Sequence, residues 1–119
     1  MKKQILVIDD DITILHALQM AFEEEGYEVE ASPNGKPVES LNGYAPNVVL
    51  LDIMLAGEDG RKLAKKIRAK YPDKPTIIMI SAMADAKASA LKSGADHFVA
   101  KPLDLDQLVE LADQACSRE

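Results

Sequence analysis

Short apolar runs alternate with stretches in which apolar residues recur every three or four positions. The runs have the length of β-strands and lie at residues 5–8, 27–31, 48–51, 76–80 and 97–100. The run at 27–31 is the weakest, because glutamates interrupt its apolar residues. The wider spacing predicts five helices, at residues 12–25, 37–41 and 84–93, after residue 60 and after residue 104. Gly26 and Gly94 follow two of these segments and are placed to end them.

The alternation of five strands and five helices predicts an α/β fold in which helices cover both faces of one doubly wound parallel sheet. The near-continuous apolar character of most strands supports this prediction, because a strand covered on one face only would alternate apolar and polar residues. A length of 119 residues suits one domain, and neither an internal repeat nor a linker divides it. We therefore expect a single domain spanning residues 1–119.

Polar side chains follow four of the predicted strands at the point where each strand ends. In chain order they are Asp9, Asp10, Asp11, Asp52, Ser81 and Lys101. Ligands of doubly wound sheets bind at the carboxyl ends of the strands, where the strand order reverses. These side chains would share one cleft if their strands are neighbours.

Three of these carboxylates would bring like charges together, which raises carboxylate pKa values and disfavours the empty pocket. A divalent ion removes the conflict, and an all-oxygen site with few protein ligands suits Mg²⁺. The candidate ligands are Asp9, Asp10 and Asp52. Acidic strand ends can also be solvated or cap the next helix, a reading that suits Asp11 better than Asp52.

The other strand ends complete a set of groups suited to phosphoryl transfer. Asp52 offers a nucleophilic carboxylate, Lys101 a cation and Ser81 a hydroxyl donor. Each also has a simpler reading, since Lys101 can be a surface lysine and Ser81 a turn or cap residue. The combination is more specific than any member, and it predicts phosphoryl transfer onto Asp52.

With these motifs in order, the chain resembles the receiver domain of two-component response regulators over essentially its whole length. The segments that carry the resemblance are residues 5–11, 51–54, 59–60, 81–82, 94–96 and 101–102. The resemblance, to single receivers of the chemotaxis-regulator type, implies a flavodoxin-like (βα)5 fold with strand order 2-1-3-4-5.

The resemblance also implies a phosphoacceptor and a metal site. Asp52 would take a phosphoryl group from a phosphohistidine on a sensor histidine kinase or a histidine phosphotransfer protein. Asp10 and Asp52 would bind Mg²⁺ directly, Asp9 mostly through water, and the Met54 backbone carbonyl would complete the protein ligands. The domain would catalyse its own phosphorylation and dephosphorylation without turning over external substrates.

The remaining family positions concern the switch. Lys101 would pair with the phosphoryl group, and the peptide before Pro102 would be cis. Ser81 would donate a hydrogen bond to a phosphoryl oxygen, and Phe98 would turn inward once Ser81 moves. A downstream protein partner would bind the face formed by the fourth helix, fifth strand and fifth helix, which includes Lys87, Lys92, His97 and Phe98.

Some positions depart from the family pattern. Ala56 stands where proline is frequent, Leu103 where phenylalanine is common, and Phe98 where tyrosine is frequent. Met54 and Met83 occupy positions that influence hydrolysis of the phosphoryl group in this family. Neither thioether orients water well, so we hypothesise slow dephosphorylation; the alternative is that both methionines only pack in loops.

The composition of the chain limits the partners that the protein can bind and the compartment in which we expect it. A net charge of −6 and 4% aromatic residues argue against direct nucleic-acid binding. No signal-peptide pattern and no apolar run of about 18 residues is present, so we expect no membrane attachment. Cys116 is the one cysteine and fits a reducing compartment, so we expect a cytoplasmic protein.

Two other functions remain as alternatives. Residues 9–13 contain Asp-x-Asp-x-Thr, the nucleophile motif of haloacid-dehalogenase-like phosphatases, with Asp9 as nucleophile. That reading lacks the later acidic motif of those enzymes and gives Asp52 no role. A receiver that is never phosphorylated and serves only as an interaction module is the other alternative, and the complete set of site residues argues against it.

Overall fold

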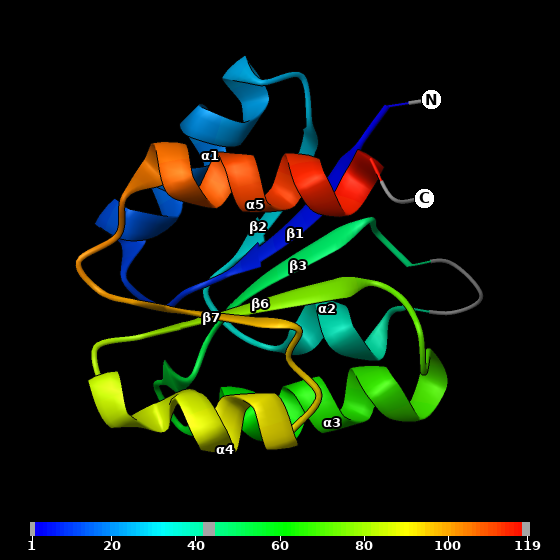
Figure 1. The fold of residues 1–119 in the computed structure, drawn as a ribbon, viewed down its shortest axis with the longest axis vertical. Coiled ribbons are helices and arrows are strands. Elements are labelled where there is room, and N and C mark those ends of the chain that lie inside the picture. The colour runs from blue at the N-terminus through cyan, green and yellow to red at the C-terminus, as the bar shows by residue number, and fades with distance from the viewer. Residues whose placement is uncertain (1, 42–44, 118–119) are drawn as a thin grey trace.

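The computed structural model describes residues 2–41 and 45–117. Its centre is a five-stranded parallel sheet with the order β2-β1-β3-β6-β7, which confirms the predicted order 2-1-3-4-5 when the two short hairpin strands are set aside (Figure 1). The strands of this sheet are β1 (Gln4–Ile8), β2 (Glu28–Ser32), β3 (Val48–Asp52), β6 (Thr76–Ser81) and β7 (His97–Ala100).

Helices cover both faces of the sheet, as the sequence predicts. On one face lie α1 (Ile12–Glu24) and α5 (Leu105–Ser117), and on the other lie α2 (Lys36–Glu39), α3 (Gly60–Lys70) and α4 (Lys87–Lys92) (Figure 1). Alternate residues of each central strand enter two separate apolar clusters. Leu6 and Ile8 pack toward α2 and α3, whereas Ile5 and Val7 pack toward α1 and α5. This two-sided burial explains the near-continuous apolar runs.

The helix ends follow the expected chemistry. Asp11 caps α1, because its Oδ1 accepts hydrogen bonds from the amides of Thr13 and Ile14 at 3.0 and 3.2 Å. Gly26 and Gly94 adopt φ values of 89° and 113° just beyond α1 and α4. Residues with a Cβ rarely adopt this backbone conformation. Both glycines therefore end their helices, as predicted.

The structure corrects three element boundaries. The second strand begins at Glu28, because the Tyr27 amide still bonds to the Phe22 carbonyl in the turn after α1. The helix predicted at 37–41 is Lys36–Glu39, and the one predicted at 84–93 divides into a 3-10 turn, η1 (Ala84–Ala86), and α4. Apolar spacing does not separate a 3-10 turn from an α-helix that continues it.

A short hairpin follows Asp52 where the sequence predicts only a loop. Its strands are β4 (Met54–Leu55) and β5 (Glu58–Asp59), and Gly57 turns between them with φ of 75°. The Gly60 amide donates to the Ile53 carbonyl at 2.7 Å, which closes the hairpin onto the end of β3. A Cβ on Gly60 would collide with the Asp52 carbonyl oxygen and lie 2.9 Å from the Ile53 Cα.

We predict that Gly60→Ala lowers the free energy of unfolding by about 2–3 kcal/mol, because backbone atoms cannot move aside as a flexible side chain can. Gly57→Ala is the control, because no atom lies within 4 Å of the new Cβ. The positive φ of residue 57 is then the only source of strain and should lower the free energy of unfolding by about 1 kcal/mol. Urea unfolding followed by circular dichroism measures both. Equal losses would show that the close approach at Gly60 is unimportant.

Candidate functional site

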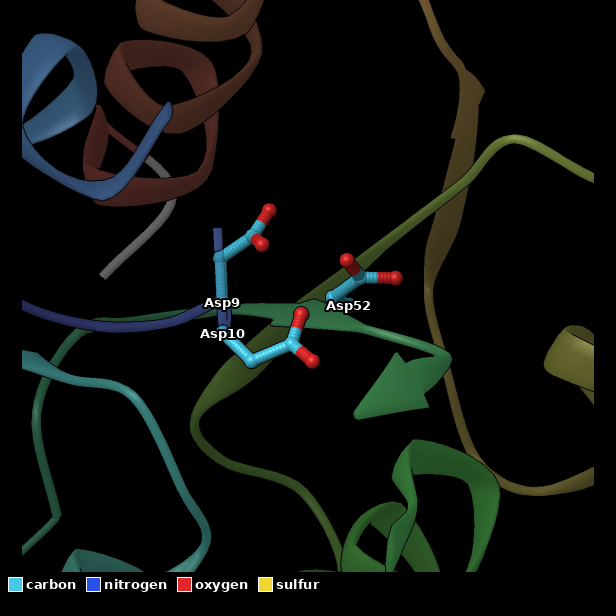
Figure 2. Close-up of side chains that lie close together, drawn as sticks. All are labelled: Asp9, Asp10 and Asp52. Carbon is cyan, nitrogen blue, oxygen red and sulfur yellow. The ribbon is translucent and has the colours of Figure 1, made fainter. Parts of the chain in front are cut away.

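Three carboxylates meet at the carboxyl edge of the sheet. Asp9 and Asp10 follow β1 and Asp52 ends β3, and these strands are neighbours with Ile8 opposite Leu51. Figure 2 shows the three side chains close together, and each contributes an oxygen to a group whose members all lie within 4.8 Å of one another. The structure thus brings together the predicted carboxylate ligands, in a geometry that can hold a metal ion.

Lys101 reaches this cluster from the far side of β6. Its Nζ lies 2.8 Å from Asp52 Oδ2 and 3.3 Å from Asp9 Oδ2, and only 18% of its side chain is exposed. The peptide joining Lys101 to Pro102 is cis, as predicted. The Lys101 amide also donates to the Ser81 carbonyl at 2.8 Å, so the base of this side chain is fixed to the end of β6.

Burial and charge shift the pKa values of two of these groups. Burial raises the pKa of Asp9, and the nearby Asp52 charge adds to the effect, while the Asp11 amide and Lys101 oppose it. Burial alone would lower the pKa of Lys101, but its hydrogen bond to Asp52 and the charges of Asp52 and Asp9 outweigh burial and raise it. The lysine is therefore held as a cation between two carboxylates.

One oxygen of the cluster supports a metal site on geometric grounds. Asp9 Oδ1 accepts the Asp11 amide at 2.9 Å, but Asp9 Oδ2 is buried and has no hydrogen-bond partner within residues 2–41 and 45–117, with only the Lys101 ion pair nearby. The Lys101 ammonium compensates this buried acceptor in part, and a bound metal ion would give it a second positive partner. Together with Asp10 and Asp52, this oxygen forms an all-oxygen donor set of the kind that hard divalent cations prefer.

Backbone amides fix the other carboxylates. Asp52 Oδ1 accepts the Met54 amide at 3.0 Å, and Asp10 Oδ2 accepts the Ala56 amide at 2.9 Å, so the hairpin after β3 is bonded to the carboxylates at the ends of both β1 and β3. Sequence reasoning missed these donors, because an amide carries no residue-specific signal. The predicted ligand role of the Met54 carbonyl stays a prediction.

The two predicted switch residues lie on neighbouring strands. Ser81 is buried at the end of β6, and its Oγ accepts the Met83 amide at 2.9 Å. A hydroxyl that accepts this bond still has its own hydrogen to donate. Phe98 is half-buried on β7, opposite Met79, and packs against the apolar cluster on the α2–α4 face. Ala100 pairs with Ser81, so Phe98 lies two residues before the edge at which Ser81 stands.

Comparison with known families identifies the family of this chain. The model of the response regulator receiver domain matches residues 5–113. The chain belongs to this family. It is the receiver domain of a two-component response regulator, a signalling switch and not an enzyme of the usual kind.

Curated relatives of this receiver domain include transcriptional regulators. The chain is 41% identical over 105 residues to the transcriptional regulatory protein CseB of Streptomyces coelicolor, covering 84% of this chain and 43% of that protein. It is 37% identical over 115 residues to the DNA-binding transcriptional regulator NtrC of Escherichia coli K12, covering 95% of this chain and 24% of that protein. The receiver domain thus spans less than half the length of these relatives.

Solved receiver domains have the same fold. The Francisella response regulator 1452 receiver domain superposes with a TM-score of 0.87 at 30% identity, covering 98% of both chains. The receiver domain of NtrX from Brucella abortus gives a TM-score of 0.86 at 31% identity, covering 97% of this chain and 99% of that one. In the described part of this receiver domain, no helix is long and apolar enough to cross a membrane.

The ion pairs of Lys101 make a prediction about the stability of this receiver domain. In metal-free buffer, Lys101→Met should lower the free energy of unfolding by roughly 2 kcal/mol, because it leaves two buried carboxylates without their cation. Lys65→Met removes an exposed lysine of α3 and should change the free energy by less than about 0.5 kcal/mol. Urea unfolding measures both, and equal effects would contradict the buried ion-pair argument.

Proposed function

We propose that Asp52 is the phosphoacceptor of this receiver domain and takes its phosphoryl group from a phosphohistidine donor. The observation that carries the proposal is the placement of Lys101 Nζ at 2.8 Å from Asp52 Oδ2, with the Met54 amide on the other oxygen. No other carboxylate of the cluster has this arrangement. Asp9 lies deeper and meets the lysine at 3.3 Å, and Asp10 is exposed and bonded to the hairpin.

Mg²⁺ fits the donor set that these carboxylates form. Asp10 and Asp52 would hold it directly and Asp9 through water, with the Met54 carbonyl as a further oxygen ligand. When bound, Mg²⁺ neutralises charge on the phosphoryl oxygens. The buried Asp9 Oδ2, which accepts no hydrogen bond among the described residues, and the convergence of three carboxylates support this assignment.

In the transfer step, an Asp52 oxygen forms a bond to phosphorus while the phosphorus–nitrogen bond of the donor histidine breaks. The electron pair of that bond stays on the imidazole nitrogen. Lys101 is held against the reacting carboxylate and stays positive, because the pKa of its amine is raised. It therefore lies where it can pair with a phosphoryl oxygen once the new bond has formed.

The Ser81–Met83 bond supports a route from this site to the surface. When Ser81 rotates and its Oγ moves toward the phosphoryl group, the Oγ moves away from the Met83 amide and this bond lengthens. Met83 directly precedes η1 and α4. Phe98 packs on the same face and can follow into the space that Ser81 leaves. The two packings would form the switch, and a near-complete population shift requires about 5 kcal/mol of differential stabilisation.

The partners follow from these roles. A sensor histidine kinase or a histidine phosphotransfer protein would supply the phosphoryl group at the carboxyl edge, in the cytoplasm. A downstream protein would read the α4–β7–α5 face, where Lys87 and Leu91 are exposed. Lys92, which the sequence places on this face, instead lines the side of α4 that faces α3. We retain one domain over residues 1–119 and no direct nucleic-acid contact as parts of the proposal.

The phosphatase alternative is disfavoured by the position of Asp11. An Asp-x-Asp motif would use Asp11 at the reacting centre, but its Oδ1 caps α1 through the amides of Thr13 and Ile14. Asp9, the nucleophile in that reading, is fully buried. Family membership supports the receiver instead, and the complete acidic cluster argues against a receiver that is never phosphorylated.

Incubation with acetyl phosphate and Mg²⁺ tests the phosphoacceptor. We predict that intact-mass spectrometry finds one added phosphoryl group per chain, and that Asp52→Ala abolishes it. Asp85→Ala, which removes an exposed carboxylate of η1, should keep the label. No Asp52-dependent gain would refute the proposal, and continuous release of phosphate from a generic phosphate ester would revive the phosphatase reading.

Two methionines generate a prediction about the lifetime of the phosphorylated state. Met54 is 57% exposed beside Asp52, and Met83 is half-buried beyond Ser81. Met54→Asn with Met83→Glu supplies polar groups that orient water, so dephosphorylation should accelerate about tenfold, equivalent to one hydrogen bond in the transition state. Loss of the phosphoryl mass over time measures the rate. Met20→Asn on α1 is the control and should leave the rate unchanged. An unchanged rate in the double variant would mean that Met54 and Met83 only pack in their loops.

A further inference from the structure

Basic residues of this acidic protein are concentrated on one helix. Six of the 11 residues of α3 are basic and none is acidic: Arg61, Lys62, Lys65, Lys66, Arg68 and Lys70. On the opposite face, α1 and α5 carry acidic residues and neither lysine nor arginine. The net charge of −6 therefore conceals one strongly basic surface.

The helix dipole favours the basic residues in the last turn of α3, which are Arg68 and Lys70. Helix stability does not explain Lys62 and Lys65. Lys62 lies in the first turn, three residues after the cap Asp59, where the helix dipole and the unpaired amides favour a carboxylate. Lys62 also stands three and four residues before Lys65 and Lys66, spacings at which like charges destabilise a helix. A residue that destabilises its own helix is expected where that residue serves in binding.

Some cations of α3 and α4 form an ion pair and others do not. Arg61 pairs with Asp59 at 2.8 Å and Arg68 pairs with Asp96 at 2.6 Å. Among residues 2–41 and 45–117, Lys62, Lys65 and Lys92 form no ion pair with a carboxylate. These three lysines remain available to an external anion.

A groove collects the unpaired lysines between α3 and α4, which lie side by side on one face of the sheet (Figure 1). It has a volume of about 560 Å³, and its lining includes Lys62 and Lys65 from α3 and Ser89 and Lys92 from α4. Asp59 and Arg61 also line it, but they pair with each other at 2.8 Å and add no net charge. Arg61 Nη1 donates to Ser89 Oγ at 3.1 Å, which ties the two helices together along the groove. The groove thus presents three cations on two joined helices.

We propose that this α3–α4 groove binds an acidic segment of a partner protein, through carboxylates that pair with Lys62, Lys65 and Lys92. A groove between two helices accepts an extended chain, whereas a nucleic-acid duplex needs a broad basic surface and would be repelled by the net charge. A second copy would have to offer a different and acidic surface, such as its α1–α5 face. Such a head-to-tail contact assembles copies into rings or open chains, whereas a partner segment occupies the groove of one molecule.

Fluorescence anisotropy tests the proposal with a fluorescein-labelled peptide of alternating Glu and Ser residues at low ionic strength. The double variant Lys62→Glu with Lys65→Glu should weaken peptide binding at least about tenfold. The matched control, Lys2→Glu with Lys74→Glu, makes the same change in net charge at exposed lysines outside the groove, and it should retain most of the affinity.

A second measurement separates binding from folding. The groove variant should melt about 2–4 °C higher than the parent protein, because the carboxylate that replaces Lys62 lies in the first turn of α3 and faces Lys66. The carboxylate that replaces Lys65 faces Arg68, and these attractions together outweigh the new repulsion between the two carboxylates. Weaker binding with a raised melting temperature supports the proposal. It is overturned by equal loss in the control variant, by an unchanged or lowered melting temperature, or by tighter binding of a labelled DNA duplex. Self-association that depends on Lys62 and Lys65 would likewise overturn it.

Discussion

The contact between Lys101 and the two buried carboxylates constrains the rest of the site. Asp9 and Asp52 end adjacent strands and lie almost out of contact with water, so their charges repel unless a cation lies between them. The lysine comes from the loop after β7, and β6 separates β7 from β3. Its side chain must therefore cross the end of β6, and the Ser81 carbonyl fixes its starting point.

Burial of the sheet on both faces makes this charge arrangement possible. Alternate residues of each strand enter two apolar clusters, which fix the strand ends relative to one another while the loops that follow remain exposed to partners. The hairpin after Asp52 binds back to the Asp10 carboxylate through the Ala56 amide, and the Ser81 hydroxyl holds the Met83 amide before α4. A rigid charge cluster is thus connected to its surroundings through a few hydrogen bonds that can be exchanged.

The same fold carries a second electrostatic arrangement that its own stability does not require. Lys62 opposes the dipole of α3, and the groove beside it gathers unpaired cations on an otherwise acidic protein. The carboxylate cluster and the basic groove have one property in common. Each holds like charges close together, and their repulsion lowers the stability of the protein when no ligand is bound. Such a loss of stability is expected at a surface that binds a ligand of opposite charge.

The sequence by itself determined the alternation of elements, the strand order through family resemblance, and the identity of Asp9, Asp10, Asp52, Ser81 and Lys101. These signals are local, because apolar periodicity and a polar residue after a strand are written in consecutive positions. Tertiary structure alone decided the hairpin after β3, the division of η1 from α4, the buried Asp9 oxygen and the groove between α3 and α4. Those features depend on distances between residues far apart in the chain. They also depend on hydrogen bonds from backbone amides, which every residue except proline carries and which therefore cannot be recognised from residue type.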